Sequence, residues 1–321
     1  MCALFRYFRQ RLLRIIPILL VGTFFTFSLT SLLPGDPTVA LLGTSATAAN
    51  VKDLRHRLEL DKPLPYRYVK WLERVATGDL GRLYANNRTV SSRVKESIVP
   101  SIELMLYAQL IALGLAIPLG VYAGYRRERL FDKLTVTSSS ALIAIPPFVL
   151  GLYLVYFFAL HLHWFNPTGY VPITENLGEH VKSMVLPSVT LAAGLFATYV
   201  RLLRSDMVAT LQEDFITMAR AKGLSPTYIL FRHALKPSLF SLVTSAGLNI
   251  GALIGGTILV EGIFAIPGFG SFIIGSVLAR EYIAVQAAFL IVVVFFIVTN
   301  LFVEFLYGVL DPRVRHARAL A

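Results

Sequence analysis

The sequence is poor in charge and nearly without cysteine. Of its 321 residues, 15% are Asp, Glu, Lys or Arg and 55% are hydrophobic. Because a soluble globular protein carries about 25% charged residues, this composition excludes a water-soluble domain and indicates an integral membrane protein. The single cysteine, Cys2, excludes a disulfide scaffold and a metal site made of several cysteines.

Motifs of several enzyme classes are missing as well. The sequence contains no Gly-x-x-x-x-Gly-Lys-Ser/Thr loop, which ATPases use to hold phosphate, so we expect no ATP hydrolysis by this chain. No Ser/His/Asp or His/Glu grouping falls at one membrane depth, and His161 and His163 have no third metal ligand near them. We therefore predict a chain that is not an enzyme and that binds no metal.

Six runs free of charged residues and histidine are long enough to cross a bilayer as helices, which takes about 20 residues. They cover residues 15–35, 104–125, 134–160, 183–200, 237–260 and 282–303. The third run is the longest, and Pro146 and Pro147 at its middle predict a break. The sequence thus predicts an all-α polytopic membrane protein with six spans.

The distribution of Lys and Arg predicts the orientation. Basic residues crowd the N-terminus, the loops after the second and fourth spans and the C-terminal tail, whereas the short loops of the other side contain Lys182 and Arg280. Since short cytoplasmic loops are rich in Lys and Arg, both termini are predicted to be cytoplasmic. The net charge of +11 therefore reflects topology and does not indicate nucleic-acid binding.

This topology divides the chain into five parts. Residues 1–14 and 311–321 are the cytoplasmic ends, 15–35 the first span, 36–103 an external segment and 104–310 the core with the other five spans. A cleavable signal peptide is an alternative for the N-terminal arginines and first run, but its removal would leave an odd number of spans. We therefore expect the first run to be a membrane helix.

Apolar residues recur at helical spacing within the external segment. They are Val51, Leu54 and Leu58, and then Tyr68, Trp71, Leu72 and Val75. This spacing predicts two short amphipathic helices. A solvated loop with interfacial aromatic residues is the alternative.

The cytoplasmic loop 205–237 contains the signals of a short helix. Glu213 and Asp214 suit a first turn, and Arg220 and Lys222 suit a last turn, because each complements the helix dipole. Gly223 can adopt the left-handed conformation that ends a helix. The sequence predicts a helix that starts near Glu213 and stops before Gly223.

A second short helix is predicted directly afterwards. Ser225 is a good N-cap and Pro226 a good first-turn residue, while Pro237 precedes the fifth span. In the first helix, small and apolar residues favour docking against another protein: Phe215, Ile216, Met218, Ala219 and Ala221. An interfacial helix that lies on lipid headgroups is the alternative.

The same loop resembles that of a known family. The stretch Thr217-Met-Ala-Arg-Ala-Lys-Gly223, followed by an amphipathic segment up to Pro237, resembles the EAA loop of membrane subunits of ATP-binding cassette (ABC) importers. Thr217 stands where that loop has its name-giving glutamate. The sequence Ala-Arg-Ala-Lys-Gly-Leu-Ser, together with Arg232-His-Ala-Leu235, resembles that of the dipeptide/oligopeptide/nickel permease subgroup.

Five further motifs of that subgroup occur in order along the chain. They are Leu33-Pro-Gly-Asp-Pro37, the pair Leu60-Asp-Lys-Pro63 and Gly78-Asp-Leu-Gly81, Glu261-Gly-Ile-Phe-Ala-Ile-Pro-Gly-Phe-Gly270, and Asp311-Pro-Arg313. The resemblance therefore extends over nearly the whole chain. It implies the fold of a type I ABC importer permease in a prokaryotic cell membrane.

The resemblance also implies partners. Such a permease forms half of a translocation pathway with a second homologous permease, and two cytoplasmic ATPase subunits hold the ATP and Mg, so this chain itself is expected to carry no cofactor. An external binding protein delivers the substrate, which we expect to be a peptide, with nickel, haem or glutathione as alternatives. Coupling to the ATPases is implied for Phe215, Met218, Ala219, Ala221, Lys222, Gly223, Leu224 and Arg232.

Polar residues in or beside the spans are candidates for the pathway or its gate, because polar groups are costly in lipid. Together with neighbouring turn residues they are Asn249, Gln109, Glu261, Phe264, Pro267 and Gly268. The alternatives are hydrogen bonds between helices for Gln109 and Asn249, interfacial anchoring for Glu261, and a plain connecting turn for residues 261–270. A transporter driven by an ion gradient is the rival function, although the interrupted second and third spans have no counterpart in the second half of the chain.

Overall fold

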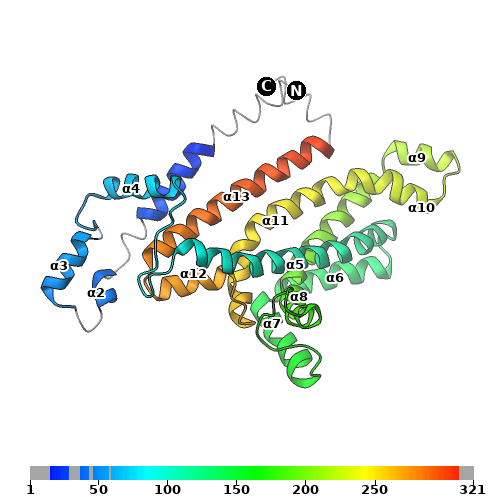
Figure 1. Cartoon of the computed structure of the whole chain (residues 1–321). Coiled ribbons are helices and arrows are strands. Elements are labelled where there is room, and N and C mark those ends of the chain that lie inside the picture. Colours follow the sequence, from blue (N-terminus) through cyan, green and yellow to red (C-terminus); the bar gives the residue numbers. More distant parts are fainter. Residues whose placement is uncertain (1–14, 29–36, 43–45, 58, 311–321) are drawn as a thin grey trace. The chain divides into compact units, whose positions relative to one another are not determined.

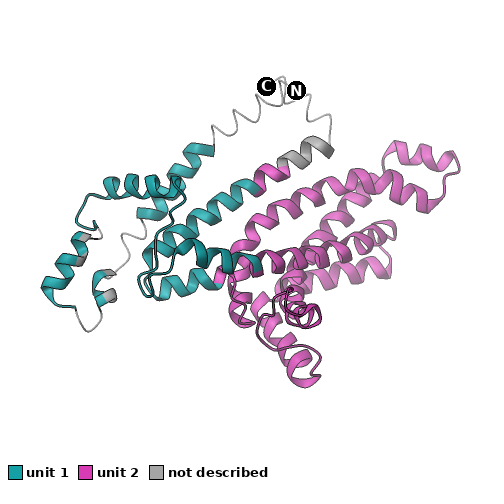
Figure 2. Ribbon diagram, viewed as in Figure 1, with its two compact units in different colours: residues 1–99, 271–298, 317–321 teal, residues 100–270, 299–316 magenta. Residues whose placement is uncertain are grey.

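The computed structural model describes residues 15–28, 37–42, 46–57 and 59–310. These residues are mainly helical and form two compact units (Figures 1 and 2). Unit 1 comprises residues 1–99, 271–298 and 317–321, and unit 2 comprises residues 100–270 and 299–316. The two units are described in turn.

Unit 1 contains the helix Ile15–Ser28, α2 (Pro37–Leu42), α3 (Ala48–Arg57) and α4 (Leu64–Ala76). Helices α3 and α4 lie where two short helices were predicted, and α2 is a further short helix that was not predicted. Tyr68 and Trp71 of α4 pack on Phe27, and the Tyr68 hydroxyl donates to the Leu20 carbonyl at 3.0 Å. The aromatic residues predicted for one helix face are thus the residues that hold α4 against the first helix.

A buried carboxylate organises another part of unit 1. Glu281 directly precedes α13 (Tyr282–Leu310) and accepts hydrogen bonds from the backbone N–H groups of Tyr84 and Ala85, both at 2.7 Å. Burial and the nearby Glu281 carboxylate together raise the pKa of Tyr84 to about 12. A carboxylate that takes two backbone donors fixes this loop against the start of α13.

In unit 2, α5 (Val90–Tyr125) and α8 (Leu177–Thr210) approach closely along small residues of α5. These residues are spaced by four and all are buried: Ala108, Ala112, Ala116, Gly120 and Gly124. A Cβ atom on Gly124 would lie 2.7 Å from the Met207 side chain. Small residues at this spacing let two membrane helices pack backbone to backbone.

Four described helices are long and apolar enough to cross a membrane: Val90–Tyr125, Leu177–Thr210, Pro226–Ile263 and Tyr282–Val303. A fifth span is formed if the pair Leu130–Ala144 and Pro147–His161 is counted, and this pair is bent by 99°. The first predicted span extends beyond the described residues, since its helix is described for Ile15–Ser28. The count of six spans therefore stays a prediction.

The bend confirms the predicted break in the third span. Helix α6 (Leu130–Ala144) ends at Ile145, which is extended because it precedes a proline. Pro146 is extended as well, and Pro147 opens α7 (Pro147–Leu154), where it has no need of an N–H donor. The helix continues as the π-helical segment η2 (Val155–His161).

Several predicted boundaries were wrong. Helix α5 begins well before residue 104, and α8 extends past residue 200 to Thr210. The predicted short second helix of the loop does not stop before Pro237: α10 (Pro226–Tyr228) and η3 (Ile229–Ala234) run into α11 (Leu235–Ile263). A proline ring clashes with the preceding turn of a regular helix, and the wider π turn η3 lies at that place.

Candidate functional site

The loop between α8 and α11 forms a compact helical corner. Helix α9 (Asp214–Ala221) has Asp214 in its first turn and Arg220 in its last, as predicted. Gly223 has a φ of 76°, and the Ser225 hydroxyl caps the next helix by accepting from the Tyr228 N–H at 3.3 Å. The predicted helix stop and helix start are therefore confirmed.

One face of α9 packs into unit 2. Ile216 is fully buried and Ala219 is 6% exposed, and both belong to the hydrophobic core that also contains Ile229 and Ala234. Ala219 was predicted among the coupling residues, but it lies on the inner face and supports the helix. These two buried residues, one on each turn, hold α9 against η3 and the hydrophobic core.

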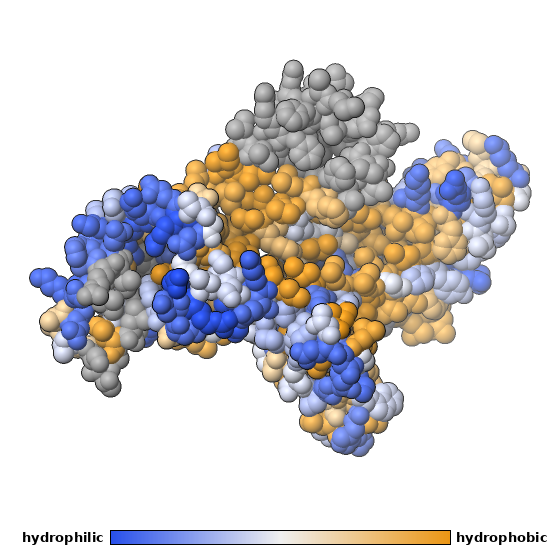
Figure 3. All heavy atoms as spheres, in the orientation of Figure 1, coloured by the Kyte–Doolittle hydropathy of each residue, from blue (hydrophilic) through white to orange (hydrophobic). Residues whose placement is uncertain are grey.

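The opposite face of this corner is exposed and partly apolar, as the mixture of orange and blue around α9 and α10 shows (Figure 3). Phe215 is 44% exposed and Met218 57%. The other predicted coupling residues Ala221, Lys222, Gly223, Leu224 and Arg232 are exposed too. The structure adds Tyr228 and Phe231, the latter 58% exposed, which the sequence analysis missed because it treated the second helix only by its boundaries. We call Phe215, Met218, Leu224, Tyr228 and Phe231 the apolar corner.

An ion pair ties α8 to α6 near this corner. The Arg204 guanidinium donates from Nε to Asp132 Oδ1 at 2.8 Å and from a terminal nitrogen to Oδ2 at 2.7 Å. The Asp132 side chain is 4% exposed and also accepts from the Glu128 N–H. A two-pronged pair of this kind fixes both position and orientation. Nothing in the sequence pattern pointed to it, because the partners are 72 positions apart.

A second polar connection joins three helices inside unit 2. The Gln109 amide on α5 donates to the Ala246 carbonyl of α11 at 2.7 Å and accepts from the Tyr199 hydroxyl of α8 at 2.9 Å. Gln109 and Tyr199 are both buried. Two interpretations were open for Gln109, a pathway residue or a hydrogen bond between helices. The structure shows the hydrogen bond between helices.

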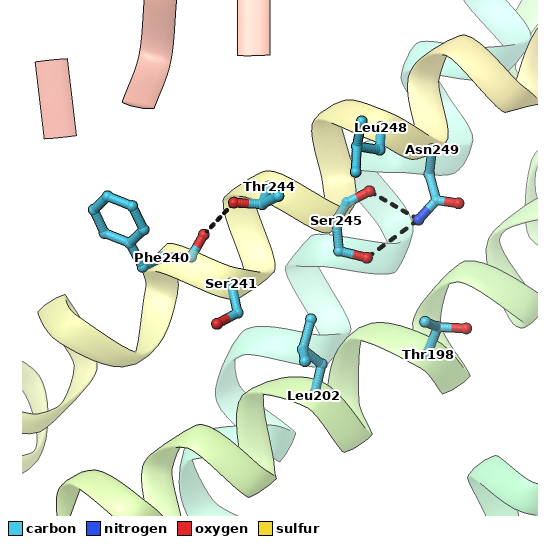
Figure 4. A pocket seen from close by; sticks show the side chains of 8 residues that line it. All are labelled: Thr198, Leu202, Phe240, Ser241, Thr244, Ser245, Leu248 and Asn249. Carbon is cyan, nitrogen blue, oxygen red and sulfur yellow. Dashed lines mark hydrogen bonds between the residues drawn. The ribbon is translucent and has the colours of Figure 1, made fainter. Parts of the chain in front are cut away.

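Asn249 lines a cavity of about 620 Å³ between α8 and α11 (Figure 4). Thr198 and Leu202 of α8 form one wall, and residues between Phe240 and Asn249 of α11 form the other. The Asn249 amide donates to the Ser245 carbonyl at 2.8 Å. Gln109 does not line this cavity, and neither do Glu261, Phe264, Pro267 and Gly268, which lie in the turn at the end of α11.

That turn, the stretch Glu261 to Gly270, is packed inside unit 2. The Glu261 carboxylate is fully buried and accepts from the Ser101 hydroxyl at 2.6 Å, and that hydroxyl in turn accepts from the Phe269 N–H at 2.7 Å. Phe264 is 1% exposed, and a Cβ atom on Gly268 would collide with the Glu261 carboxylate. Among the predicted gate candidates of this turn, Pro267 alone is exposed.

The stretch is therefore a fixed support in this structure. It is more elaborate than a plain connecting turn, since α12 (Phe269–Leu278) begins within it. His161 and His163, considered for nickel, are exposed. Within the described residues no group of three or more His, Cys, Asp or Glu could hold a metal ion.

Comparison with known families gives these features a context. A sequence model described as "Binding-protein-dependent transport system inner membrane component" matches residues 116–316, and the N-terminal model of the same kind of component matches residues 4–97. The chain belongs to this family. It is accordingly a multi-pass inner membrane component of a transport system, and the rival interpretation as a transporter driven by an ion gradient is set aside.

Similar sequences are permeases of this family. A putative peptide transport system permease protein of Brucella abortus (strain 2308) is 34% identical over 96% of this chain and 98% of its own length. A dipeptide transport system permease protein of Alkalihalophilus pseudofirmus is 32% identical over 97% and 99%. A glutathione transport system permease protein of Salmonella paratyphi A is 34% identical over 97% and 99%.

The fold matches a solved importer. A chain of the MetNI methionine ABC transporter, in an inward-facing conformation, superposes with a TM-score of 0.57 at 13% identity, covering 68% of this chain and 96% of that one. The predicted ABC importer permease fold is thereby confirmed. The family works within ABC importer complexes, together with ATPase and substrate-binding partners.

Proposed function

We propose that this chain is one of two homologous permease subunits in an ABC importer of peptides, and that it lines half of the translocation pathway. The observation that carries the proposal is the helical corner at α9, which presents an apolar surface on a firmly packed support. Relatives named as peptide, dipeptide and glutathione permeases favour a peptide substrate. Glutathione, itself a tripeptide, is the alternative that these names also favour.

The apolar corner is suited to a cytoplasmic ATPase subunit. Phe215 and Met218 project from a helix whose inner residue Ile216 is fixed in the core, so a push on the outer face moves α9 as a rigid body. Helix α9 leads directly into Gly223 and the long helix Pro226–Ile263. Closure of an ATPase pair can thus reach the membrane helices and shift them between two packed arrangements.

The test is reconstitution of the complete complex in liposomes with its binding protein. We expect ATP-dependent accumulation of a labelled peptide, and competition by excess glutathione separates the two substrate candidates. The double variant Phe215→Ala/Met218→Ala should lower the accumulation rate at least tenfold and weaken ATPase binding, since aromatic anchors dominate interfaces. Phe148→Ala is the matched control, because Phe148 is 45% exposed in α7, away from the corner.

Topology can be tested separately. Replacing Cys2, the only cysteine, by serine allows a single cysteine to be placed at Phe215 or at Tyr66. We expect an impermeant thiol reagent applied to intact cells to label Tyr66→Cys and to spare Phe215→Cys. The reverse pattern, or peptide uptake by the purified chain without its companions, would refute the proposal.

A further inference from the structure

The cavity between α8 and α11 has an unusual chemical character for the surface of a membrane helix pair. None of the described residues that line it is ionisable, yet five of them carry a hydroxyl or an amide: Thr198, Ser241, Thr244, Ser245 and Asn249. Polar groups that face lipid are costly. These groups lie beside apolar side chains in an open groove, so this face offers hydrogen-bonding positions without any charge.

Three of the five polar side chains of the lining donate a hydrogen bond within their own helix. The Thr198 hydroxyl lies 3.1 Å from the Gly194 carbonyl, and the Thr244 hydroxyl lies 2.8 Å from the Phe240 carbonyl. Because a carbonyl can only accept, each hydroxyl must donate to it and keeps its lone pairs for the cavity. The Asn249 amide nitrogen likewise donates to Ser245, which leaves the amide oxygen as an acceptor.

We propose that this cavity is the part of the translocation pathway formed by this chain, and that it takes the peptide backbone through its N–H groups. The inference rests on the proposed function. The wall offers acceptors to N–H donors, and it offers no counter-charge to an ionised terminus or side chain. The volume of about 620 Å³ lies within the range of roughly 300–1,000 Å³ typical of ligand sites. Such a surface holds any peptide weakly, whatever its sequence, which suits a passage.

Accessibility distinguishes a passage from a helix-packing face. In the Cys2→Ser background, Ser241→Cys in the reconstituted complex should react with a small charged thiol reagent, and saturating peptide with ATP should change the labelling rate at least threefold. Ser188→Cys is the control, because Ser188 lies on α8 and is buried. Absence of labelling at both positions would mean that a partner helix or lipid covers the cavity, and would overturn the inference.

Recognition through N–H groups is tested by changing both partners. Thr198→Val/Thr244→Val removes two acceptors at nearly constant volume, and a backbone N-methylated peptide removes the donors. For the wild type, we expect uptake of the N-methylated peptide to be about tenfold slower than uptake of the parent. In the double variant this ratio should fall to about two. Thr190→Val, which changes a buried threonine of α8 outside the cavity, should leave the ratio as in the wild type.

The outcomes separate the two proposals. Because the same binding protein delivers both peptides to every variant, its own preference cancels when ratios are compared. If the wild-type complex accumulates no peptide, both the proposed function and this inference fail. If the wild type accumulates peptide but the ratio is the same in the double variant, the cavity assignment fails and the proposed function stands.

Discussion

Two turns of unit 2 use similar residues in opposite ways. The stretch from Glu261 to Gly270 buries Phe264 and Phe269 and even its carboxylate. The corner at α9 and α10 exposes Phe215 and Phe231 instead. Both turns are held by close packing, so the difference does not lie in rigidity. It lies in whether the apolar side chains have partners within the chain, and this separates a support from a docking surface.

The largest effect is expected where a buried carboxyl group is removed from the first of these turns. Glu261→Ala takes away the acceptor of Ser101 and leaves a cavity, which should lower the free energy of unfolding by about 4 kcal/mol. Thermal unfolding in detergent measures the loss. Glu175→Ala, at an exposed position, should unfold like the wild type, and an equally stable Glu261→Ala would show that the turn needs no internal carboxylate.

Neighbouring residues of α9 allow the comparison to be drawn within one helix. Ile216→Ala should cost about 3 kcal/mol, because it empties a fully buried site. Phe215→Ala should change stability by less than about 0.5 kcal/mol and yet impair ATPase binding. Melting and co-purification with the ATPase measure the two properties, and a loss of stability in both variants would contradict the division into inner and outer faces.

Glycine substitutions should have a smaller effect in the buried turn. Gly268→Ala would place a methyl group against the Glu261 carboxylate, which should cost about 2 kcal/mol as overpacking. Gly262→Ala is matched to it, since nothing lies within 4 Å of its Cβ position on α11, and it should be slightly stabilising. Equal melting temperatures for the two variants would mean that the turn can open without cost.

The smallest effect is expected at the exposed corner. Gly223 has a φ of 76° and no atom within 4 Å of its Cβ position, so Gly223→Ala should cost about 1 kcal/mol through backbone strain alone. Gly223→Asn should cost less, because asparagine tolerates this conformation. A bulky residue should also lower transport with assembly intact, and transport unaffected by Gly223→Trp would remove this residue from the coupling surface.

Local signals in the sequence predicted local structure well. Pro146 and Pro147 predicted the bend, and Gly223 and Ser225 predicted the end of one helix and the start of the next. Each of these depends on the residue itself and its immediate neighbours. Pro237 led to the wrong prediction that the second short helix ends before it. The π turn before Pro237 lets the helix continue, and the sequence alone does not reveal such a turn.

Contacts between distant parts of the chain escaped the sequence analysis. Gln109 and Asn249 were both proposed for the pathway, but the fold joins Gln109 to Tyr199 and places Asn249 at a cavity wall. Glu261 was proposed for the pathway or its gate. It is buried inside the protein, where it accepts a hydrogen bond from the Ser101 hydroxyl. An isolated polar residue in an apolar run indicates that its side chain needs a hydrogen-bond partner. The packing of the helices decides which residue that partner is.

The pairing of Asp132 with Arg204 has a consequence for how the chain enters the membrane during its synthesis. The ribosome makes the carboxylate 72 residues before the guanidinium that neutralises it. Asp132 lies just before the predicted span 134–160 and next to Lys133, so until Arg204 emerges its carboxylate can stay at the membrane surface. The pair can therefore fix α6 only when α8 arrives, and in a chain truncated between the two helices α6 should be inserted but less firmly held.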